Sequence, residues 1–150
     1  MDLLQLQQNL LSIDVWELLK PILNNYLEDI EELNRKQLSE GLLANGESTP
    51  SHSGGKMSEI YVDNKIERGV YPEPLYPLMN FYNTGDFYRS ITAYLDDAGI
   101  MFESNDEKAL ELESKYSSYL MGLTQESLSV LTSKIGSELI ESLYGAILKN

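Results

Sequence analysis

The residue best suited to chemistry is His52, the single histidine of this 150-residue chain. An imidazole serves as a general base or a metal ligand only where a second group positions it. His52 lies in a serine- and glycine-rich stretch without a positioned partner, and its neighbours Ser51 and Ser53 are ordinary loop residues. The chain has no cysteine, so a single chain cannot form a zinc site from histidine and cysteine. We therefore expect no catalytic residue, no metal and no cofactor.

A second group that could do chemistry is the acidic cluster of Glu103, Asp106 and Glu107. Paired carboxylates can act as general acid and base, or bind a cation. However, the spacing matches no calcium-binding loop, and acids are favourable at helix N-termini because the helix dipole is positive there. Asp96 and Asp97 belong to a turn, and no glycine-rich phosphate loop follows any predicted strand. The pattern indicates helix capping, and we expect a protein that is not an enzyme.

Composition limits the partners that this chain can have. Asp and Glu number 24 against 11 Lys and Arg, and the formal net charge of −13 repels both phosphate backbones and anionic lipid surfaces. No window of about 18 apolar residues could span a bilayer, and the N-terminal residues lack the pattern of an export signal. The ten tyrosines have few basic residues near them, which favours packing over stacking on bases. We therefore expect no membrane contact and no specific nucleic acid.

The elements that must position any site begin with a long N-terminal helix. Asp14 and Glu17 are typical of a helix start, and apolar residues then recur at steps of three and four as far as Leu33. Pro21 lies either in the first turn of a later helix or at a kink, because proline lacks an amide donor. Residues 41–56 are rich in glycine and serine, which predicts a flexible loop.

Residues 57–82 are predicted to form an extended arm without a helix, because three prolines restrict the backbone there. Its apolar residues pack either within the same chain or against another subunit. Alternation from Phe87 to Leu95, a turn at residues 96–99 and further alternation from Ile100 predict an antiparallel hairpin. Two C-terminal helices follow, the first over roughly residues 105–117. The second is capped by Thr124. We expect a single domain over residues 1–150, of the α+β class.

Three short motifs occur in order: Asn-Thr-Gly-Asp-Phe-Tyr-Arg-Ser-Ile at residues 83–91, Ser-Asn-Asp-Glu-Lys at 104–108 and Gly-Leu-Thr-Gln-Glu at 122–126. The first motif, with its proline-containing arm and hairpin, resembles the tail-completion and neck proteins of tailed bacteriophages. The three together resemble short proteins from phages and prophages of gut Bacteroides-type bacteria, including crAss-like phages. This resemblance runs from about residue 35 to the end.

The resemblance implies a structural virion protein that is assembled in the bacterial host cytoplasm and forms a ring at the portal–tail junction or in the tail. Its partners would be other copies of itself and portal, connector or tail proteins. Acidic residues facing the lumen would let DNA slide past without binding. The expected subunit-interface residues come from the arm and the hairpin: Tyr71, Leu75, Tyr76, Thr84, Gly85, Asp86, Phe87, Tyr88, Arg89 and Tyr94.

Other interpretations stay open at this point. The motif from Thr84 to Ile91 either lies at a ring interface or merely starts the hairpin. The chief alternative function is a soluble acidic interaction module, such as a phage-encoded inhibitor that mimics nucleic acid, which the charge of −13 permits. An enzyme that uses carboxylates, with Glu103 or Asp106 at its centre, is the third hypothesis.

Overall fold

The computed structural model describes residues 1–52 and 56–149. This part of the chain combines helices with a two-stranded antiparallel sheet, which confirms the predicted α+β class. Its elements, in chain order, are α1 (Leu3–Ser12), α2 (Val15–Leu23), η1 (Asn24–Tyr26), α3 (Leu27–Ser39), α4 (Lys56–Glu67), η2 (Glu73–Leu75), α5 (Asp86–Ser90), β1 (Ile91–Asp96), β2 (Gly99–Ser104), α6 (Ala109–Lys115) and α7 (Gln125–Lys149).

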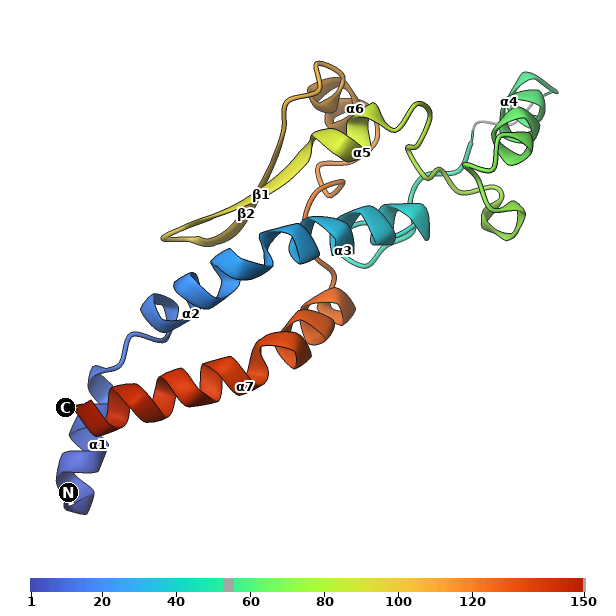
Figure 1. Cartoon of the computed structure of the whole chain (residues 1–150). Coiled ribbons are helices and arrows are strands. Elements are labelled where there is room, and N and C mark those ends of the chain that lie inside the picture. Colours follow the sequence, from blue (N-terminus) through green and yellow to red (C-terminus); the bar gives the residue numbers. More distant parts are fainter. Residues whose placement is uncertain (53–55, 150) are drawn as a thin grey trace.

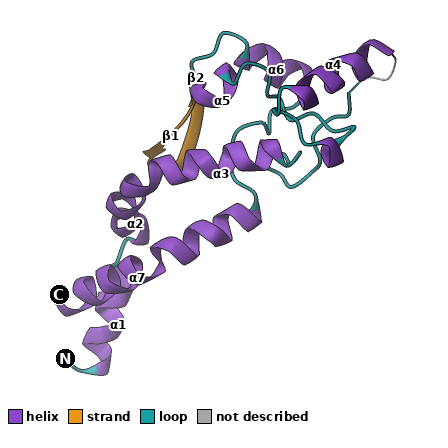
Figure 2. Ribbon diagram, turned by 45° about the vertical axis from the view of Figure 1, so that its right-hand side comes forward, coloured by secondary structure: helices purple, strands orange, loops and turns teal. Residues whose placement is uncertain are grey.

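The molecule is elongated, with α2 and α3 lying alongside α7 and the hairpin on the opposite side of α3 (Figure 1). Both termini lie at one end, and α4 lies at the other, a layout that the turned view in Figure 2 repeats. A core between α2, α3, α7 and the hairpin holds the layers together. Its buried residues are Ile22, Leu23, Ile30, Ala93, Leu131 and Ile135.

The predicted long N-terminal helix is interrupted: Pro21 lies inside α2, and the 3-10 turn η1 separates α2 from α3. Its start is confirmed, since the Asp14 carboxylate accepts hydrogen bonds from the amides of Trp16 and Glu17. The α-helical bonding then gives way to the 3-10 turn Asn24–Tyr26 before α3 begins. Pro21 lies inside α2 and has no amide hydrogen to donate, and asparagine is a poor helix former. Together they explain an interruption that apolar periodicity alone does not show.

Helix α3 attaches the hairpin through charged side chains. Arg35 donates from Nε to the Tyr88 carbonyl at 2.9 Å and from Nη2 to the Ile91 carbonyl at 3.0 Å. Glu31, which is paired with Arg35 at 3.3 Å, accepts a hydrogen bond from the Ala93 amide at 2.9 Å. The bonds to Ile91 and Ala93 satisfy backbone groups of β1, and the bond to Tyr88 satisfies a carbonyl of α5, just before that strand. The hairpin is therefore tied to α3 by its first strand.

The same helix holds the segment between α6 and α7 through two buried amides. Asn34 donates from Nδ2 to the Leu120 carbonyl at 3.1 Å. Gln37 donates from Nε2 to the Gly122 carbonyl at 3.0 Å and accepts the Thr124 amide hydrogen at its Oε1, at 2.8 Å. This bidentate contact orients Thr124, whose Oγ1 accepts the Ser127 amide and caps α7. The predicted cap at Thr124 and the final helix are confirmed.

The predicted strand from Phe87 was wrong over its first four residues, because residues 86–90 form the short helix α5. A single helical turn places Phe87, Tyr88 and Ile91 toward the core, and so short a segment cannot be told from a strand by alternation. The hairpin itself is confirmed, with Ile91 opposite Ser104 and Asp96 opposite Gly99. Along β1 the burial alternates as expected: Ile91 and Ala93 are buried, whereas Thr92 and Tyr94 are exposed.

Within the predicted arm over residues 57–82, the prediction that no helix forms was wrong, because α4 covers residues 56–67. The spacing of Ile60 and Val62, two residues apart, is typical of a strand with both side chains on one buried face, but Ile60 is exposed. The buried positions are Val62 and Lys65, one helical turn apart. A lysine on the buried face hides the helical pattern. The proline-rich remainder contains η2 and otherwise lacks regular structure up to residue 77.

The predicted loop over residues 41–56 is placed by several contacts in its described part. Leu42 pairs with Ser48, Ser51 pairs with Leu78, and the buried Thr49 donates its hydroxyl to the Met79 carbonyl. Positions 53–55, Ser53 among them, lie outside the described residues. The first C-terminal helix, α6, starts at Ala109 rather than near residue 105, because Ser104 and Asp106 bond to amides in a turn that precedes it.

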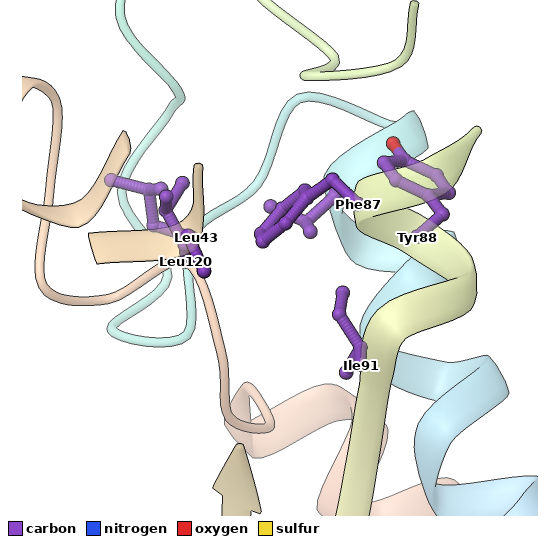
Figure 3. Packing of buried hydrophobic residues seen from close by; sticks show 7 residues of the cluster. Leu43, Phe87, Tyr88, Ile91 and Leu120 are labelled. Carbon is purple, nitrogen blue, oxygen red and sulfur yellow. The ribbon is translucent and has the colours of Figure 1, made fainter. Parts of the chain in front are cut away.

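A second hydrophobic cluster joins the loop, α5 and α6. Figure 3 shows Phe87 between Leu43 and Leu120 on one side and Tyr88 on the other, with Ile91 below. The fully buried Leu38 connects this cluster to α3. Burying such side chains contributes roughly 1.5–3 kcal/mol each. The motif at residues 83–91 is therefore built into the core.

Candidate functional site: a pocket between the arm and the hairpin

A pocket of about 630 Å³ opens between the arm, α5 and the turn before α6. This volume lies in the range of roughly 300–1,000 Å³ that is usual for small-molecule sites. We call it the arm pocket, and its lining combines aromatic, charged and amide side chains. The lining residues are His52, Tyr61, Lys65, Met79, Phe81, Tyr82, Asn83, Thr84, Gly85, Asp86, Phe87, Ser90, Asn105, Asp106, Glu107, Lys108, Leu112 and Tyr116.

Lys65 on α4 is the most unusual residue of the arm pocket, because its side chain is only 2% exposed. Its Nζ donates to Asn80 Oδ1 at 2.6 Å and lies 5.5 and 5.3 Å from the ring centroids of Tyr61 and Tyr71. Burial, with a smaller contribution from Arg68, lowers the pKa of Lys65 to about 8. Over residues 1–52 and 56–149, no ion pair joins Lys65 to a carboxylate. A positive charge is therefore enclosed without a neutralising partner.

His52 lies beside the same two tyrosines. Its ring centroid is 5.9 Å from that of Tyr61 and 6.0 Å from that of Tyr71, both in edge-on geometry. Its Nε2 is buried, and in the described part of the chain no hydrogen-bond partner reaches it. Burial, and then the charge of Lys65, lower the pKa of His52. His52 is therefore neutral at neutral pH, which leaves the ammonium group of Lys65 as the charge beside these two rings.

The first sequence motif forms one wall of the arm pocket. Gly85 has φ +87°, and a Cβ there would lie 2.7 Å from Tyr82 Oη and 2.8 Å from Arg89 Nη1. Glycine suits this position because it adopts a left-handed backbone freely. Thr84 Oγ1 donates to Asp86 at 2.6 Å, and Arg89 pairs with the same carboxylate. The Thr84 hydroxyl and then Arg89 lower the pKa of Asp86.

The second motif contributes residues 105–108 to the same pocket. Asp106 accepts the Lys108 amide at 2.8 Å, so its carboxylate stabilises the turn before α6. The predicted capping of the helix itself was wrong, because the N-cap of α6 is Lys108 and no side chain caps it. The third motif lies elsewhere, at the start of α7. Two of the three motifs thus meet across one pocket, whereas the third serves to join α3 to α7 through Gln37.

The predicted subunit-interface residues fall into two groups. Tyr71, Phe87 and Tyr88 are 3%, 6% and 8% exposed, so their side chains are enclosed in the chain's own core. Tyr71 and Tyr88 each donate their hydroxyl to a backbone carbonyl inside the arm. Gly85 is buried and Leu75 half-buried. The exposed members are Tyr76, Thr84, Asp86, Arg89 and Tyr94.

Sequence reasoning did not find the pairing of Lys65 with His52. In the sequence, His52 lies in a loop-like stretch, and Lys65 lies thirteen residues away in the proline-containing arm. The one available signal was the spacing of Lys65 three residues after Val62, which places both on one helix face. No local pattern indicates that this face packs against residues 71–80.

The described residues contain neither a group of metal ligands nor a membrane-spanning helix. In the part of the chain that the structure describes, no three His, Asp or Glu side chains come together as metal ligands. Among the same residues, no helix has the length and apolar character needed to cross a bilayer.

Comparison with known proteins found no matching family model, no matching curated protein and no matching solved structure.

Proposed function

We propose that this chain is a non-enzymatic structural subunit of a tailed-phage particle, a neck or tail-completion protein that assembles head to tail into a ring. The proposal begins from the three ordered motifs and their resemblance to proteins of that kind. The single structural observation that carries it is a pair of separate exposed apolar surfaces, one at the terminal end of the molecule and one on the hairpin.

The first surface lies where α1 packs against the end of α7, and we call it the terminal surface. Helix α1 is docked by a polar residue: Asn9 is 8% exposed and donates from Nδ2 to the Ile147 carbonyl at 3.2 Å. Its leucines face outward instead, an arrangement opposite to that of a helix that covers a core. The exposed apolar residues at this end are Leu3, Leu4, Leu10, Leu11, Ile140, Tyr144 and Leu148.

The second surface is the outer face of the hairpin. Tyr94 and Met101 are directly opposite each other in the strand register, and both are exposed. Cross-strand neighbours of this kind form one contiguous contact area. Trp16, which donates its indole hydrogen to the Asp96 carbonyl at 3.0 Å, fixes the hairpin tip against α2. The face is therefore presented on a supported element.

Two different apolar surfaces on one chain are what a head-to-tail contact needs. A two-fold dimer uses one self-complementary patch, whereas a ring uses two unlike patches that meet between neighbours. Exposed leucines and tyrosines on both surfaces offer the apolar area that assembly would bury. The net charge of −13 also suits a wall past which DNA slides without adhering.

The proposal is tested by peptide mass spectrometry of gradient-purified phage particles, in which this chain is quantified against the portal protein. We expect it to be present at a small multiple of the portal copy number. Absence from the particles would contradict the proposal and would favour the acidic interaction module, for which binding to a basic host protein would then be the measurement.

The terminal surface gives a sharper prediction. Replacing Leu11 with glutamate puts a charge where a neighbouring copy would bury apolar area, so incorporation into particles should fall by at least tenfold. Leu110→Glu on α6 is a matched control, because Leu11 and Leu110 are both 79% exposed. Equal incorporation of the two variants, measured by the same mass spectrometry, would show that the terminal surface is not an interface.

A further inference from the structure

The arm pocket holds an enclosed ammonium group without a neutralising acid, and we propose that it binds a free small carboxylate with an apolar or aromatic body. In this complex the carboxylate oxygens accept hydrogen bonds from Lys65 Nζ and from a protonated Nε2 of His52. The inference goes beyond the structural role proposed above and does not depend on it. It concerns the arm pocket, whereas the proposed ring contacts are the terminal surface and the outer face of the hairpin.

The first argument is the unbalanced charge at Lys65. An ammonium group has three hydrogens, and in residues 1–52 and 56–149 the acceptor bonded to Nζ is Asn80 Oδ1. That oxygen also accepts the Tyr82 amide hydrogen at 3.2 Å, so it is shared. An isolated buried charge is strongly unfavourable unless an opposite charge and hydrogen bonds compensate it. A carboxylate entering the pocket supplies both.

The second argument is the position of His52. Lys65 Nζ and the His52 ring lie beside the same pair of rings, Tyr61 and Tyr71, at 5.3–6.0 Å from their centroids. Both side chains line the arm pocket. His52 Nε2 is buried and has no bonding partner among the described residues, which is an uncommon state for a buried polar atom. Lys65 Nζ and His52 Nε2 therefore lie close to the same two rings in the arm pocket, and both can donate hydrogen bonds to a ligand.

The chemical class of the ligand follows from charge and lining. Beside Tyr61 and Tyr71, one ammonium group and a neutral imidazole balance a single negative charge. Elsewhere on the lining three carboxylates, those of Asp86, Asp106 and Glu107, outnumber the one further lysine, Lys108, and they repel a dianion such as phosphate more strongly than a monoanion. Apolar contact comes from Phe81, whose ring lies 5.4 Å from that of Tyr116. A monoanionic carboxylate with an apolar body fits these features.

The test uses the full wild-type chain and its single histidine. The imidazole Cε1 proton gives one resolved NMR signal, which is followed while benzoate, acetate or inorganic phosphate is added at constant ionic strength. We expect benzoate to shift the His52 signal saturably and to raise the pKa of His52, since a nearby anion stabilises the imidazolium form. Acetate should act more weakly, and phosphate should act no more than chloride does.

Variants separate the site from general effects. In Lys65→Met the benzoate shift should be lost, whereas Lys36→Met, at an exposed position of α3, should keep it. Three outcomes would overturn the proposal: no saturable shift with benzoate, a shift as large in Lys65→Met as in the wild type, or an equal shift with phosphate. If the His52 signal changes with protein concentration before any ligand is added, the pocket binds a carboxylate side chain of a second copy instead, and the proposal is overturned. If Lys65→Met fails to fold, the comparison of benzoate with acetate and phosphate on the wild-type chain still tests the proposal.

Discussion

Replacing Lys65 with methionine should raise the free energy of unfolding at neutral pH by up to about 3.5 kcal/mol. The folded chain encloses this ammonium group, and its pKa falls from 10.5 to about 8. A difference of one pKa unit corresponds to about 1.4 kcal/mol between the protonated and neutral forms. Methionine keeps much of the side-chain length without the charge, and Asn80 Oδ1 keeps the Tyr82 amide as a partner.

The pH dependence of this gain has a definite sign. Between about pH 8 and pH 10.5 the unfolded chain still holds the Lys65 proton that the folded chain has lost. Wild-type stability attributable to Lys65 therefore rises with pH across that window, and the advantage of Lys65→Met shrinks. The groups that face Lys65 are His52, Tyr61, Tyr71 and Asn80, with Arg68 adding repulsion.

Urea unfolding of both proteins at several pH values measures this effect. Lys36→Met makes the same chemical change at an exposed residue, so its stability should stay within about 0.5 kcal/mol of the wild type. A destabilised Lys65→Met protein, or a gain that does not shrink as the pH rises, would show that Lys65 stabilises the fold. The site would then need no ligand to explain the buried charge.

Replacing Gln37 with leucine should lower the free energy of unfolding by about 2–5 kcal/mol. Leucine has a similar volume but leaves the Gly122 carbonyl and the Thr124 amide without their partner. Each buried polar group left unsatisfied costs about 1–3 kcal/mol. Because Thr124 also caps α7, the loss reaches the longest helix of the described chain.

The measurement is again urea unfolding, followed by circular dichroism. Gln125→Leu is the matched control, because Gln125 is exposed in the first turn of α7 and should change stability by no more than about 0.5 kcal/mol. Similar midpoints for the two variants would mean that the contact between α3 and the start of α7 is dispensable.

Elements with strong local signals were predictable from the sequence. The Asp14 and Thr124 caps, the turn at residues 96–99 and the inward positions of Ile91 and Ala93 all follow from local chemistry, and the structure confirms them. Errors arose where a segment was short or its buried face contained a polar residue. Residues 86–90 are too few to show a period, and Lys65 concealed the buried face of α4.

The arm pocket could not be predicted, because its two polar groups come together through tertiary packing. Residues 71–80 bring Tyr71 and Asn80 against α4, and the strand-like pairing of Ser51 with Leu78 brings His52 to the same place. Sequence spacing carries no information on either contact. The terminal surface has no sequence signal for a related reason, since whether the leucines of α1 are buried or exposed depends on which elements pack against that helix.

The central position of α3 also affects the order in which the chain can fold during synthesis. The fully buried Ile30 belongs to a cluster with Ala93, Leu131 and Ile135, and Gln37 bonds to residues beyond position 120. The helices made first therefore lack their partner α7 until nearly the whole chain has left the ribosome. Contacts so distant in sequence slow folding and leave apolar surface exposed to other nascent chains. A chaperone that shields the N-terminal helices would raise the yield of folded chain.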